Sequence, residues 1–313
     1  MSEPIPTSEA SLSQSPEWLQ RALASHSYLA DMPLCTVAHL ALALPRPLLL
    51  EGDAGVGKTA LALALAEVVG GPLIRLQCYE GLDVSQAVYE WDHARQLVHL
   101  RTAEATGELR NATSTSVEAE LYSERFLVER PLLAAISAPA GTPSPVLLID
   151  EIDRADDEFE AFLLEVLADQ AITIPELGTR RAVVSPVVIL TSNRTRDLHD
   201  ALKRRCLYHW VEHPTYEREV AIIELRGRSV DERTAREVAA MVQHFRELGL
   251  YKPPGVSEAV DWATALSILG ANLTAESAQA TLGTVIKIRE DRERIEASGL
   301  AHLVELARAK ATE

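Results

Sequence analysis

The stretch Gly52-Asp-Ala-Gly-Val-Gly-Lys-Thr59 decides the fold, because it matches the pattern G-x-x-x-x-G-K-[ST] at every defined position. It follows the apolar run 47–51, which predicts a short buried strand, and it precedes the Ala- and Leu-rich stretch 59–69, which predicts a helix. The glycines let the backbone wrap closely around phosphate groups with its N–H groups pointing inward, and the following helix adds its positive end. A phosphate-binding loop between a strand and a helix is therefore expected.

The loop also carries the side chains that ATP and a magnesium ion require. Lys58 supplies a positive charge for the β- and γ-phosphates, and the hydroxyl of Thr59 is a hard oxygen ligand suited to Mg²⁺. We therefore expect Mg·ATP to bind here. The expected nucleotide contacts are Gly52, Asp53, Ala54, Gly55, Val56, Gly57, Lys58, Thr59, Ala60 and, from a second segment, Asp150.

That second segment is the apolar run 146–149, which is followed by Asp150 and Glu151. A strand that is buried on both faces and ends in an acid places a carboxylate at the carboxyl edge of a sheet, where α/β folds bind ligands. Asp150 is expected to hold Mg²⁺, directly or through a water, so that Thr59 and Asp150 are the predicted metal ligands. Glu151 is expected to orient and polarise the water that attacks ATP.

Two further polar features follow in the chain. The apolar run 187–190 leads to Asn193, which could hold the attacking water or touch the γ-phosphate; an ordinary turn asparagine is the alternative. Arg204 and Arg205 lie at the end of an expected helix that starts near Asp197. A guanidinium can neutralise charge on the γ-phosphoryl group, and a partner subunit can donate it. A solvated basic pair at a helix C-terminus is the equal alternative.

Strand patterns that alternate with helical ones predict an α/β fold with a parallel sheet between helices. We assign residues 15–212 to this core and residues 1–14, which are rich in Ser, Pro and Glu, to a flexible arm. Apolar runs 172–175 and 181–184 flank 176–179 and predict a β-hairpin. Residues 213–313 show only helical patterns and predict a small all-helical lid, in which Ser257 caps one helix and 274–298 forms another.

Composition and charge narrow the function classes. The chain of 313 residues is 47% apolar and carries a formal net charge of -16, so nucleic-acid phosphates and anionic lipids are repelled at long range. The N-terminus lacks the apolar region of a secretory signal, and the longest apolar stretch, 34–50, is too short and too interrupted to span a membrane. We therefore expect a cytoplasmic protein with no membrane span and no nucleic-acid partner. Its three cysteines, Cys35, Cys78 and Cys206, form no metal-binding pair.

The order of these motifs resembles that of the AAA+ ATPases. More narrowly, the chain is similar to the MoxR family, in the branch of CoxD-type maturation ATPases. Besides the phosphate-binding loop, four segments carry this resemblance: LIRLQCYEGLDVSQAVYEWDHARQL at 73–97, VLLIDEIDRADDEFEAFLLEVL at 146–167, ITIPELGT at 172–179 and LKRRCLYHW at 202–210. The loop and the Asp-Glu pair are generic to many ATPases, whereas the first and last of these segments are far more specific to the branch.

The resemblance implies an AAA+ core with a helix-2 insertion within 81–141 and a pre-sensor-1 hairpin at 171–184. It implies a homo-oligomer, a hexameric ring, in which Asn193 is sensor 1 and Arg205 is the arginine finger with Arg204 as support. It also implies a chaperone that works with a von Willebrand factor A (VWA) domain protein of the CoxE type. Its metalloenzyme client would be a molybdenum hydroxylase such as carbon monoxide dehydrogenase. Many relatives carry a sensor-2 arginine at the start of a lid helix, and the corresponding stretch 255–262 has none.

Two other function classes compete with this chaperone. AAA+ motors that act on nucleic acid also carry helix-2 insertions, but the acidic balance and the lack of a basic, aromatic-interleaved stretch disfavour this reading. P-loop folds also include small-molecule kinases. Glu151 and the helical C-terminal region favour hydrolysis over transfer to a metabolite.

Overall fold

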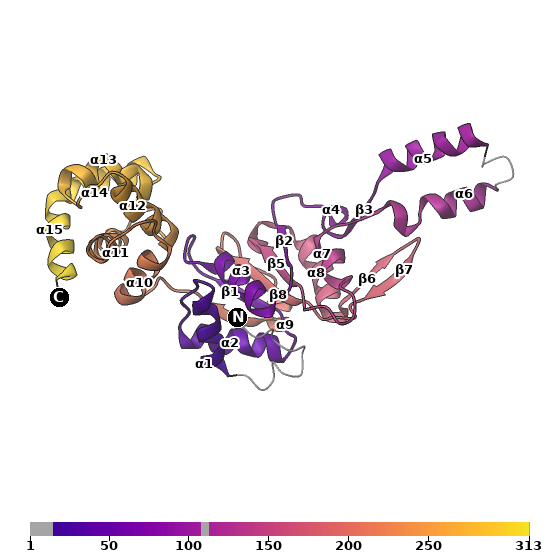
Figure 1. Ribbon diagram of the computed structural model, residues 1–313, viewed down its shortest axis with the longest axis horizontal. Coiled ribbons are helices and arrows are strands. Elements are labelled where there is room, and N and C mark those ends of the chain that lie inside the picture. Colours follow the sequence, from indigo (N-terminus) through magenta and orange to yellow (C-terminus); the bar gives the residue numbers. More distant parts are fainter. Residues whose placement is uncertain (1–14, 108–112, 313) are drawn as a thin grey trace. The chain divides into compact units, whose positions relative to one another are not determined.

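The computed structural model describes residues 15–107 and 113–312, so the expected arm at 1–14 lies outside the described residues. The fold is α/β, as predicted (Figure 1). Its centre is a five-stranded parallel sheet with the strand order β2-β5-β8-β1-β9. The strands are β1 (Leu48–Glu51), β2 (Leu73–Gln77), β5 (Val146–Asp150), β8 (Val187–Ser192) and β9 (Leu207–Trp210).

The sheet register brings polar residues to one edge. Leu73 of β2 lies opposite Val146 of β5, and the pairing continues until Gln77 lies opposite Asp150. β5 is buried along its whole length, which explains its uninterrupted apolar sequence. Because the carboxyl ends of parallel strands share one edge of a sheet, the last residues of β2, β5 and β8 lie along the same edge.

The described chain divides into two compact units. The first comprises residues 36–50 and 65–209 with the described residues up to Pro16, and the second comprises 17–35, 51–64 and the chain from Trp210 onward. Besides β1 and β9, the boundaries fall inside three helices, which each contribute to both units: α1 (Pro16–Ser25), α2 (Met32–Ala43) and α3 (Lys58–Val69). Each unit is described by itself below.

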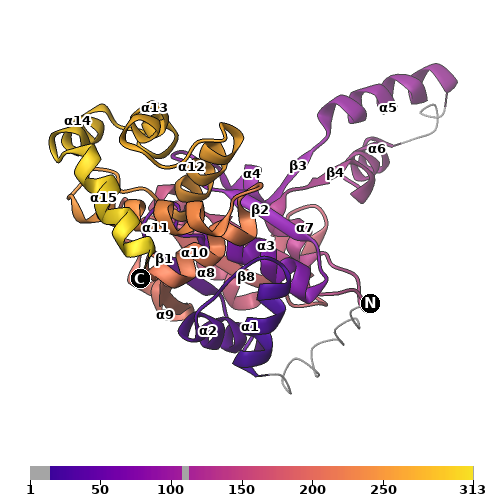
Figure 2. The same ribbon diagram turned by 60° about the vertical axis from the view of Figure 1, so that its left-hand side comes forward.

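In the first unit, the sheet packs against α7 (Pro131–Ile136) and α8 (Asp157–Asp169), whose buried faces include Leu132 and Phe159. Residues 84–107 and 113–129 form a side structure. Its elements are α4 (Val84–Val88), β3 (Tyr89–Trp91), α5 (His93–Thr106), α6 (Ser114–Leu121), η3 (Glu124–Phe126) and β4 (Leu127–Glu129). β3 pairs with β4 in antiparallel fashion, and both views show α5 and α6 extending from this ribbon as an arm (Figures 1 and 2).

The rest of the first unit contains a hairpin and two short helices. β6 (Ala171–Ile174) and β7 (Gly178–Arg181) pair directly, with Ile172 opposite Arg180. η4 (Ile152–Arg154) follows β5, and α9 (Asp200–Arg205) precedes β9. The expected hairpin is present, but its second strand begins at Gly178 and ends at Arg181 instead of spanning 181–184. Gly178 has a left-handed φ of 82°, which lets the chain reverse three residues earlier than the apolar pattern suggested.

The C-terminal part of the second unit is helical: α10 (Tyr216–Arg226), α11 (Glu232–Glu247), α12 (Val256–Ile268), α13 (Ala275–Val285), α14 (Arg289–Ala297) and α15 (Leu300–Ala311). Phe245 stacks on Trp262 in its core, with ring centroids 5.7 Å apart, and the indole N–H of Trp262 donates to Thr281. The buried Glu219 accepts two hydrogen bonds from Arg246, at 2.6 and 2.8 Å, so this buried charge is paired.

Two predictions about these helices are wrong. The stretch 274–298 is two helices, because Ile286 leaves the helical conformation and its buried side chain joins the core together with Ile295. Gly255 caps α12 in place of Ser257, since the carboxylate of Glu258 reaches back to the amide of Gly255 at 3.1 Å. Within residues 15–107 and 113–312, no helix combines the length and apolarity that crossing a membrane requires.

Candidate functional site

The phosphate-binding loop belongs to the second unit, between β1 and α3. Gly55 and Gly57 adopt left-handed φ angles of 80° and 99°, which disfavour any side chain. A Cβ at Gly52 would lie 2.4 Å from the carbonyl oxygen of Val211, so this position is also closed to other residues. The ε-ammonium of Lys58 is buried and donates to the carbonyls of Gly52 and Asp53 at 2.7 Å each. The loop therefore has the conformation and the charge that an anion site needs.

The start of α12 lies directly against this loop. The amide of Val256 donates to the carbonyl of Gly55 at 2.9 Å, and a Cβ added at Gly255 would lie 2.7 Å from the Cα of Gly55. Many members of the family that the chain resembles carry a sensor-2 arginine at the start of a lid helix, and residues 255–262 contain no arginine. In the structure, this stretch contacts the loop through its backbone. Because Gly55 and Gly255 lack side chains, the phosphate-binding loop and the start of α12 can approach closely.

His213 provides a second contact between the loop and the segment that leads into α10. Its Nε2 lies 3.4 Å from a carboxylate oxygen of Asp53. Burial lowers the pKa of His213, the guanidinium of Arg246 lowers it further, and Asp53 offsets these effects only in part. The ring is therefore neutral at pH 7, and its contact with Asp53 is between a neutral donor and a carboxylate rather than an ion pair.

Substitution of Gly255 by alanine is expected to disturb the loop. The new methyl group would meet backbone atoms of Gly55 at 2.7 and 2.8 Å, and backbone cannot move aside as a side-chain end can. We expect the variant to lose about 1–3 kcal/mol of stability, as overpacked sites do. Its affinity for ATP should also fall about tenfold, because the loop must shift. Thermal unfolding and titration with a fluorescent ATP analogue measure the two effects.

Gly283→Ala is the matched control for this variant. Gly283 lies inside α13, and a Cβ there would meet nothing within 4 Å. Alanine in a helix interior is favoured over glycine by up to about 1 kcal/mol, so this variant should keep its ATP affinity and unfold at an equal or higher temperature. If Gly255→Ala behaved in the same way as Gly283→Ala, the contact between α12 and the loop would have no bearing on nucleotide binding.

The acidic edge of the sheet belongs to the first unit. Asp150, at the end of β5, is buried, and two neighbours hold its carboxylate. The hydroxyl of Thr191 donates to one oxygen at 2.5 Å, and the guanidinium of Arg75 donates to the other at 2.6 Å. The carboxylate is thereby fixed in one orientation. A fixed carboxylate at a strand end is a hard oxygen donor of the type that Mg²⁺ prefers, so the residue fits the predicted metal role.

Glu151 is held in place from three directions. Its backbone has a left-handed φ of 55°, and its amide donates to the hydroxyl of Thr191 at 2.9 Å. Its carboxylate accepts from the amide groups of Gln77 at 3.1 Å and Asn193 at 3.4 Å. Arg154 lies 3.4 Å from the same carboxylate. Non-glycine residues in this conformation carry strain that the surroundings must offset, and they occur preferentially at functional sites.

The structure thus brings Asp150, Glu151 and Asn193 together, and it adds three residues that the sequence reasoning missed: Arg75, Gln77 and Thr191. Arg75 and Gln77 belong to β2, and the position of Gln77 at the carboxyl end of this strand was the available signal. Thr191 directly follows the apolar run 187–190, and this position alone gives no indication of its contacts. Its hydroxyl accepts from Glu151 and donates to Asp150, a role that depends on the register of β5 and β8.

Arg204 and Arg205 end α9, and both side chains are exposed. Among the described residues, neither guanidinium has a hydrogen bond or an ion pair. The backbone carbonyls of both residues instead accept hydrogen bonds from Arg46, at distances of 3.0 to 3.2 Å. Arg46 therefore fixes the end of this helix while the two side chains stay available for another molecule.

The three cysteines show no sign of a redox or nucleophilic role. All are buried with free thiols. Burial raises the pKa of the Cys35 thiol to about 11, and it raises the pKa of Cys78 and Cys206 to about 12. The nearby carboxylate of Asp150 adds to the shift of Cys78. Thiols with such pKa values stay protonated at pH 7 and are poor nucleophiles.

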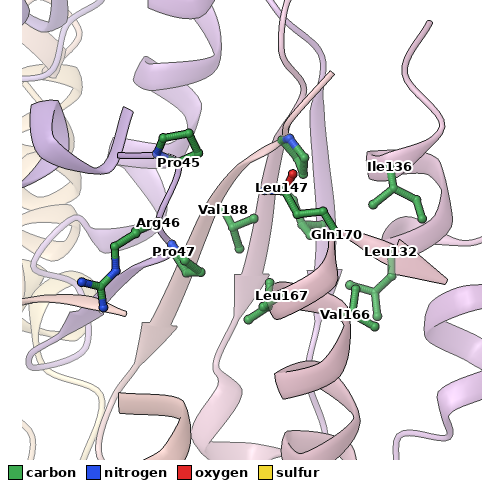
Figure 3. Close-up of a pocket in the computed structure, with 11 residues that line it drawn as sticks. Pro45, Arg46, Pro47, Leu132, Ile136, Leu147, Val166, Leu167, Gln170 and Val188 are labelled. Carbon is green, nitrogen blue, oxygen red and sulfur yellow. The ribbon is translucent and has the colours of Figure 1, made fainter. Parts of the chain in front are cut away.

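A pocket in the first unit offers no alternative site. It lies near the amino ends of β5 and β8, lined by side chains of two strands and two helices that include Leu147, Val188, Leu132 and Val166 (Figure 3). Its volume is about 20 Å³. A cavity of that size holds a water molecule and nothing larger, so it cannot be a substrate site.

The chain is similar to known proteins over two ranges. The family model described as AAA domain (dynein-related subfamily) matches residues 47–206, just over half of the chain. The matched range includes the phosphate-binding loop, the acidic edge and both arginines. A segment of 51 residues, 16% of the chain, is 51% identical to part of midasin from Giardia intestinalis. The alignment covers about 1% of that midasin.

Proposed function

We infer that this chain, which belongs to the AAA domain family in its dynein-related subfamily, uses the energy of ATP hydrolysis to remodel other proteins. AAA+ membership supports ATP-driven remodelling in general. The observation that carries the hydrolytic step is the arrangement around Glu151, whose carboxylate is positioned by Gln77 and Asn193 beside the fixed carboxylate of Asp150.

For nucleotide binding, we propose that the loop from Gly52 to Ala60 holds the phosphates of ATP. Its inward-facing N–H groups and the start of α3 favour negative charge, and Lys58 exchanges its bonds to the loop carbonyls for bonds to phosphate oxygens. Thr59 and Asp150 would hold Mg²⁺ through hard oxygen atoms. The ion, when bound, supplies charge that offsets the negative charge of the phosphates.

For hydrolysis, we propose that Glu151 accepts a hydrogen bond from the attacking water and aligns it. Its left-handed backbone and the contacts from Gln77 and Asn193 reduce the orientations that its carboxylate can adopt. A base that is already oriented loses less entropy in the transition state. The amide group of Asn193 can exchange its hydrogen bond to Glu151 for one to water or to the γ-phosphate, as a sensor residue would.

For assembly, we propose a ring of identical subunits, a hexamer, in which Arg205 of each subunit acts at the nucleotide of its neighbour, with Arg204 as support. Two observations support this: both guanidiniums are exposed, and Arg46 fixes the backbone that carries them. AAA+ proteins are typically oligomeric, which agrees with this assignment. An arginine supplied by a partner stabilises the charge that develops on the γ-phosphoryl group.

For the biological output, we propose a cytoplasmic chaperone of the MoxR type that activates a metalloenzyme, a molybdenum hydroxylase, together with a VWA-domain partner. The strings at 73–97 and 202–210 and the hairpin that follows α8 support this proposal. A motor acting on nucleic acid is disfavoured by the net charge of -16. A small-molecule kinase is disfavoured because a carboxylate at the position of Glu151 favours hydrolysis over transfer to a metabolite.

The proposal predicts which partner stimulates ATP hydrolysis. The hydrolysis rate should rise when a VWA-domain protein encoded beside this chain is added, and it should not rise with single-stranded or duplex DNA. A steady-state phosphate-release assay with each addition measures this. The chaperone function would be wrong if the protein bound single-stranded DNA more tightly than about micromolar Kd at physiological salt, since that exceeds ordinary non-specific binding.

Deletion of the hairpin tip, residues 176–179, extends this experiment. Basal hydrolysis should stay unchanged in this variant, because the hydrogen bonds of these residues run within the hairpin, from Leu177 to Ile174 and between Thr179 and Thr173. Activation of the metalloenzyme client should be lost. A variant that still loaded the client with its cofactor at the normal rate would show that the hairpin has no part in remodelling.

A further inference from the structure

Apart from the acidic edge, the first unit contains a large groove, which is bounded by α4, β3, α8 and the β6–β7 hairpin. Its volume is about 1160 Å³, and it is partly open to solvent. Small-molecule pockets are usually about 300–1,000 Å³ and enclose most of their ligand. A larger, partly open groove fits a length of polypeptide better than a small molecule.

One wall of the groove is aromatic. Tyr89 and Trp91 of β3 and Phe162 of α8 line it, and all three are half-buried against the core beneath. The rings of Tyr89 and Trp91 pack in a T-shaped arrangement with a centroid distance of 6.1 Å. The rings of Trp91 and Tyr122 pack in the same arrangement at 5.2 Å. Aromatic rings that are fixed before binding provide apolar contact area at a low cost in conformational entropy.

The groove has an excess of negative charge among its groups that make no ion pair. Glu165 and Asp169 lie one turn apart on α8, are exposed, and have carboxylates that make no ion pair or hydrogen bond with another described residue. Of the two arginines that line the groove, Arg130 pairs with Glu90, whereas Arg181 has only a hydrogen bond to the backbone carbonyl of Asp169 at 3.4 Å, so two carboxylates without an ion pair face one such guanidinium. The groove therefore favours a partner with lysine or arginine side chains.

The floor of the groove includes an unpaired strand edge. The amide of Ala182 donates to the carbonyl of Gln170 at 2.8 Å, which makes these two residues a hydrogen-bonded pair of the hairpin. Hydrogen-bonded and non-bonded pairs alternate along an antiparallel ribbon, so Ala171 and Thr173 turn their backbone groups away from β7. Both residues line the groove. Such an edge can pair with an extended segment of another chain.

We propose that this groove binds an extended segment of the protein that is remodelled, and that the segment pairs with the outer edge of β6. Its apolar side chains contact Tyr89, Trp91 and Phe162, and its intervening lysine or arginine side chains lie beside Glu165 and Asp169. The inference rests on the proposed remodelling function and names the class of substrate segment. A nucleic acid would instead bring phosphates to the two open carboxylates, which repel them.

Peptide binding to the full chain tests the proposal. Three fluorescein-labelled peptides serve as probes: alternating lysine and valine, alternating glutamate and valine, and the lysine–valine peptide with methyl groups on alternate backbone nitrogens. The lysine–valine peptide should bind, as measured by fluorescence anisotropy. The glutamate–valine peptide should bind at least about tenfold more weakly, since each cross-strand charge pair changes affinity modestly. The methylated peptide should also bind more weakly, because it cannot donate hydrogen bonds to β6.

A charge reversal separates this groove from the rest of the acidic surface. The variant Glu165→Lys with Asp169→Lys should invert the preference, so that the glutamate–valine peptide binds more tightly than the lysine–valine peptide. The paired control Glu67→Lys with Glu217→Lys changes the net charge by the same amount on exposed helix faces outside the groove. It should keep the original preference. The proposal is overturned if both variants shift binding equally, or if methylation of the peptide has no effect.

The same variants separate peptide binding in the groove from ATP hydrolysis. Neither Glu165 nor Asp169 touches the acidic edge, so basal ATP hydrolysis should be unchanged in the reversed variant. Charge-dependent peptide binding without any ATP hydrolysis would support the groove and contradict the ATPase. Normal hydrolysis with no charge dependence of peptide binding would leave the ATPase intact and reject the groove.

Discussion

Arg205→Ala is expected to lower the rate of ATP hydrolysis about a thousandfold while the isolated subunit binds ATP almost as well as before. The expected size is the low end for an arginine that stabilises a phosphoryl-transfer transition state. Binding should survive because the guanidinium of Arg205 makes no hydrogen bond or ion pair with another described residue, and its removal leaves the end of α9 fixed by Arg46. Phosphate release and a nucleotide titration on the same preparation measure the two quantities.

Three comparisons make this prediction specific. Arg204→Ala should have a smaller effect, because the resemblance assigns Arg204 the supporting role. Arg228→Ala removes an exposed arginine from the chain beyond α10 and should leave the rate unchanged. Mixing the Arg205→Ala and Glu151→Gln variants should restore part of the activity, since a mixed ring contains interfaces where an intact Glu151 meets an intact Arg205.

The oligomeric state decides whether an arginine from a neighbour can act at all. Sedimentation and native mass measurement in the presence of ATP should show a ring for the unmodified chain. A monomer that hydrolysed ATP at the full rate would contradict the model, because Arg205 would then have no neighbouring nucleotide to reach. Equal rates for Arg205→Ala and the unmodified chain would contradict it as well.

The strand–loop–helix segment was predictable because its chemistry is local. The pattern from Gly52 to Thr59 is complete within eight positions, and the left-handed φ angles of its glycines and the bonds from Lys58 back to the loop carbonyls are local to it. The same is true of the buried strand that ends at Asp150. Apolar runs bounded by such signals identify strands of a parallel sheet without any knowledge of their order.

Other features depended on contacts between distant segments. The support of Glu151 by Gln77 joins residues 74 positions apart, and the contact of Gly255 with Gly55 joins residues that are 200 apart in the numbering. Strands β3 and β4 were not predicted, because three-residue strands that sandwich a helical arm carry almost no periodic signal. The break between α13 and α14 was missed because Val285-Ile-Lys-Ile288 contains neither proline nor glycine.

The role of Glu151 depends both on its place in the sequence motif and on its conformation in the folded chain. The sequence motif predicts a carboxylate after a buried strand, but it says nothing of a left-handed φ of 55° or of the two amide groups that hold the side chain. These features turn a generic acidic residue into one with a fixed direction. They also define what a substitution must preserve in order to test the carboxylate alone.

Glu151→Gln is expected to bind Mg·ATP as well as the unmodified chain but to hydrolyse it at least about a hundredfold more slowly. Glutamine keeps the size of the side chain and one acceptor oxygen, so it can still accept a hydrogen bond from Gln77 or from Asn193. It cannot serve both amide groups equally, and it cannot take a proton from water. Loss of a positioned base typically costs about 10²–10⁴ in rate.

Single-turnover hydrolysis of radiolabelled ATP measures this step directly, because it separates the chemical step from product release. Glu158→Gln neutralises an exposed carboxylate in the first turn of α8 and is the control that should keep the full rate. Lys58→Ala should lose tight ATP binding instead, since the loop then has no side-chain cation for the phosphates. Glu151 would not be the base if the glutamine variant hydrolysed ATP at nearly the unmodified rate. A hundredfold loss with unchanged ATP affinity would assign the water-activating step to this carboxylate, because binding and chemistry would then respond to different residues of one site.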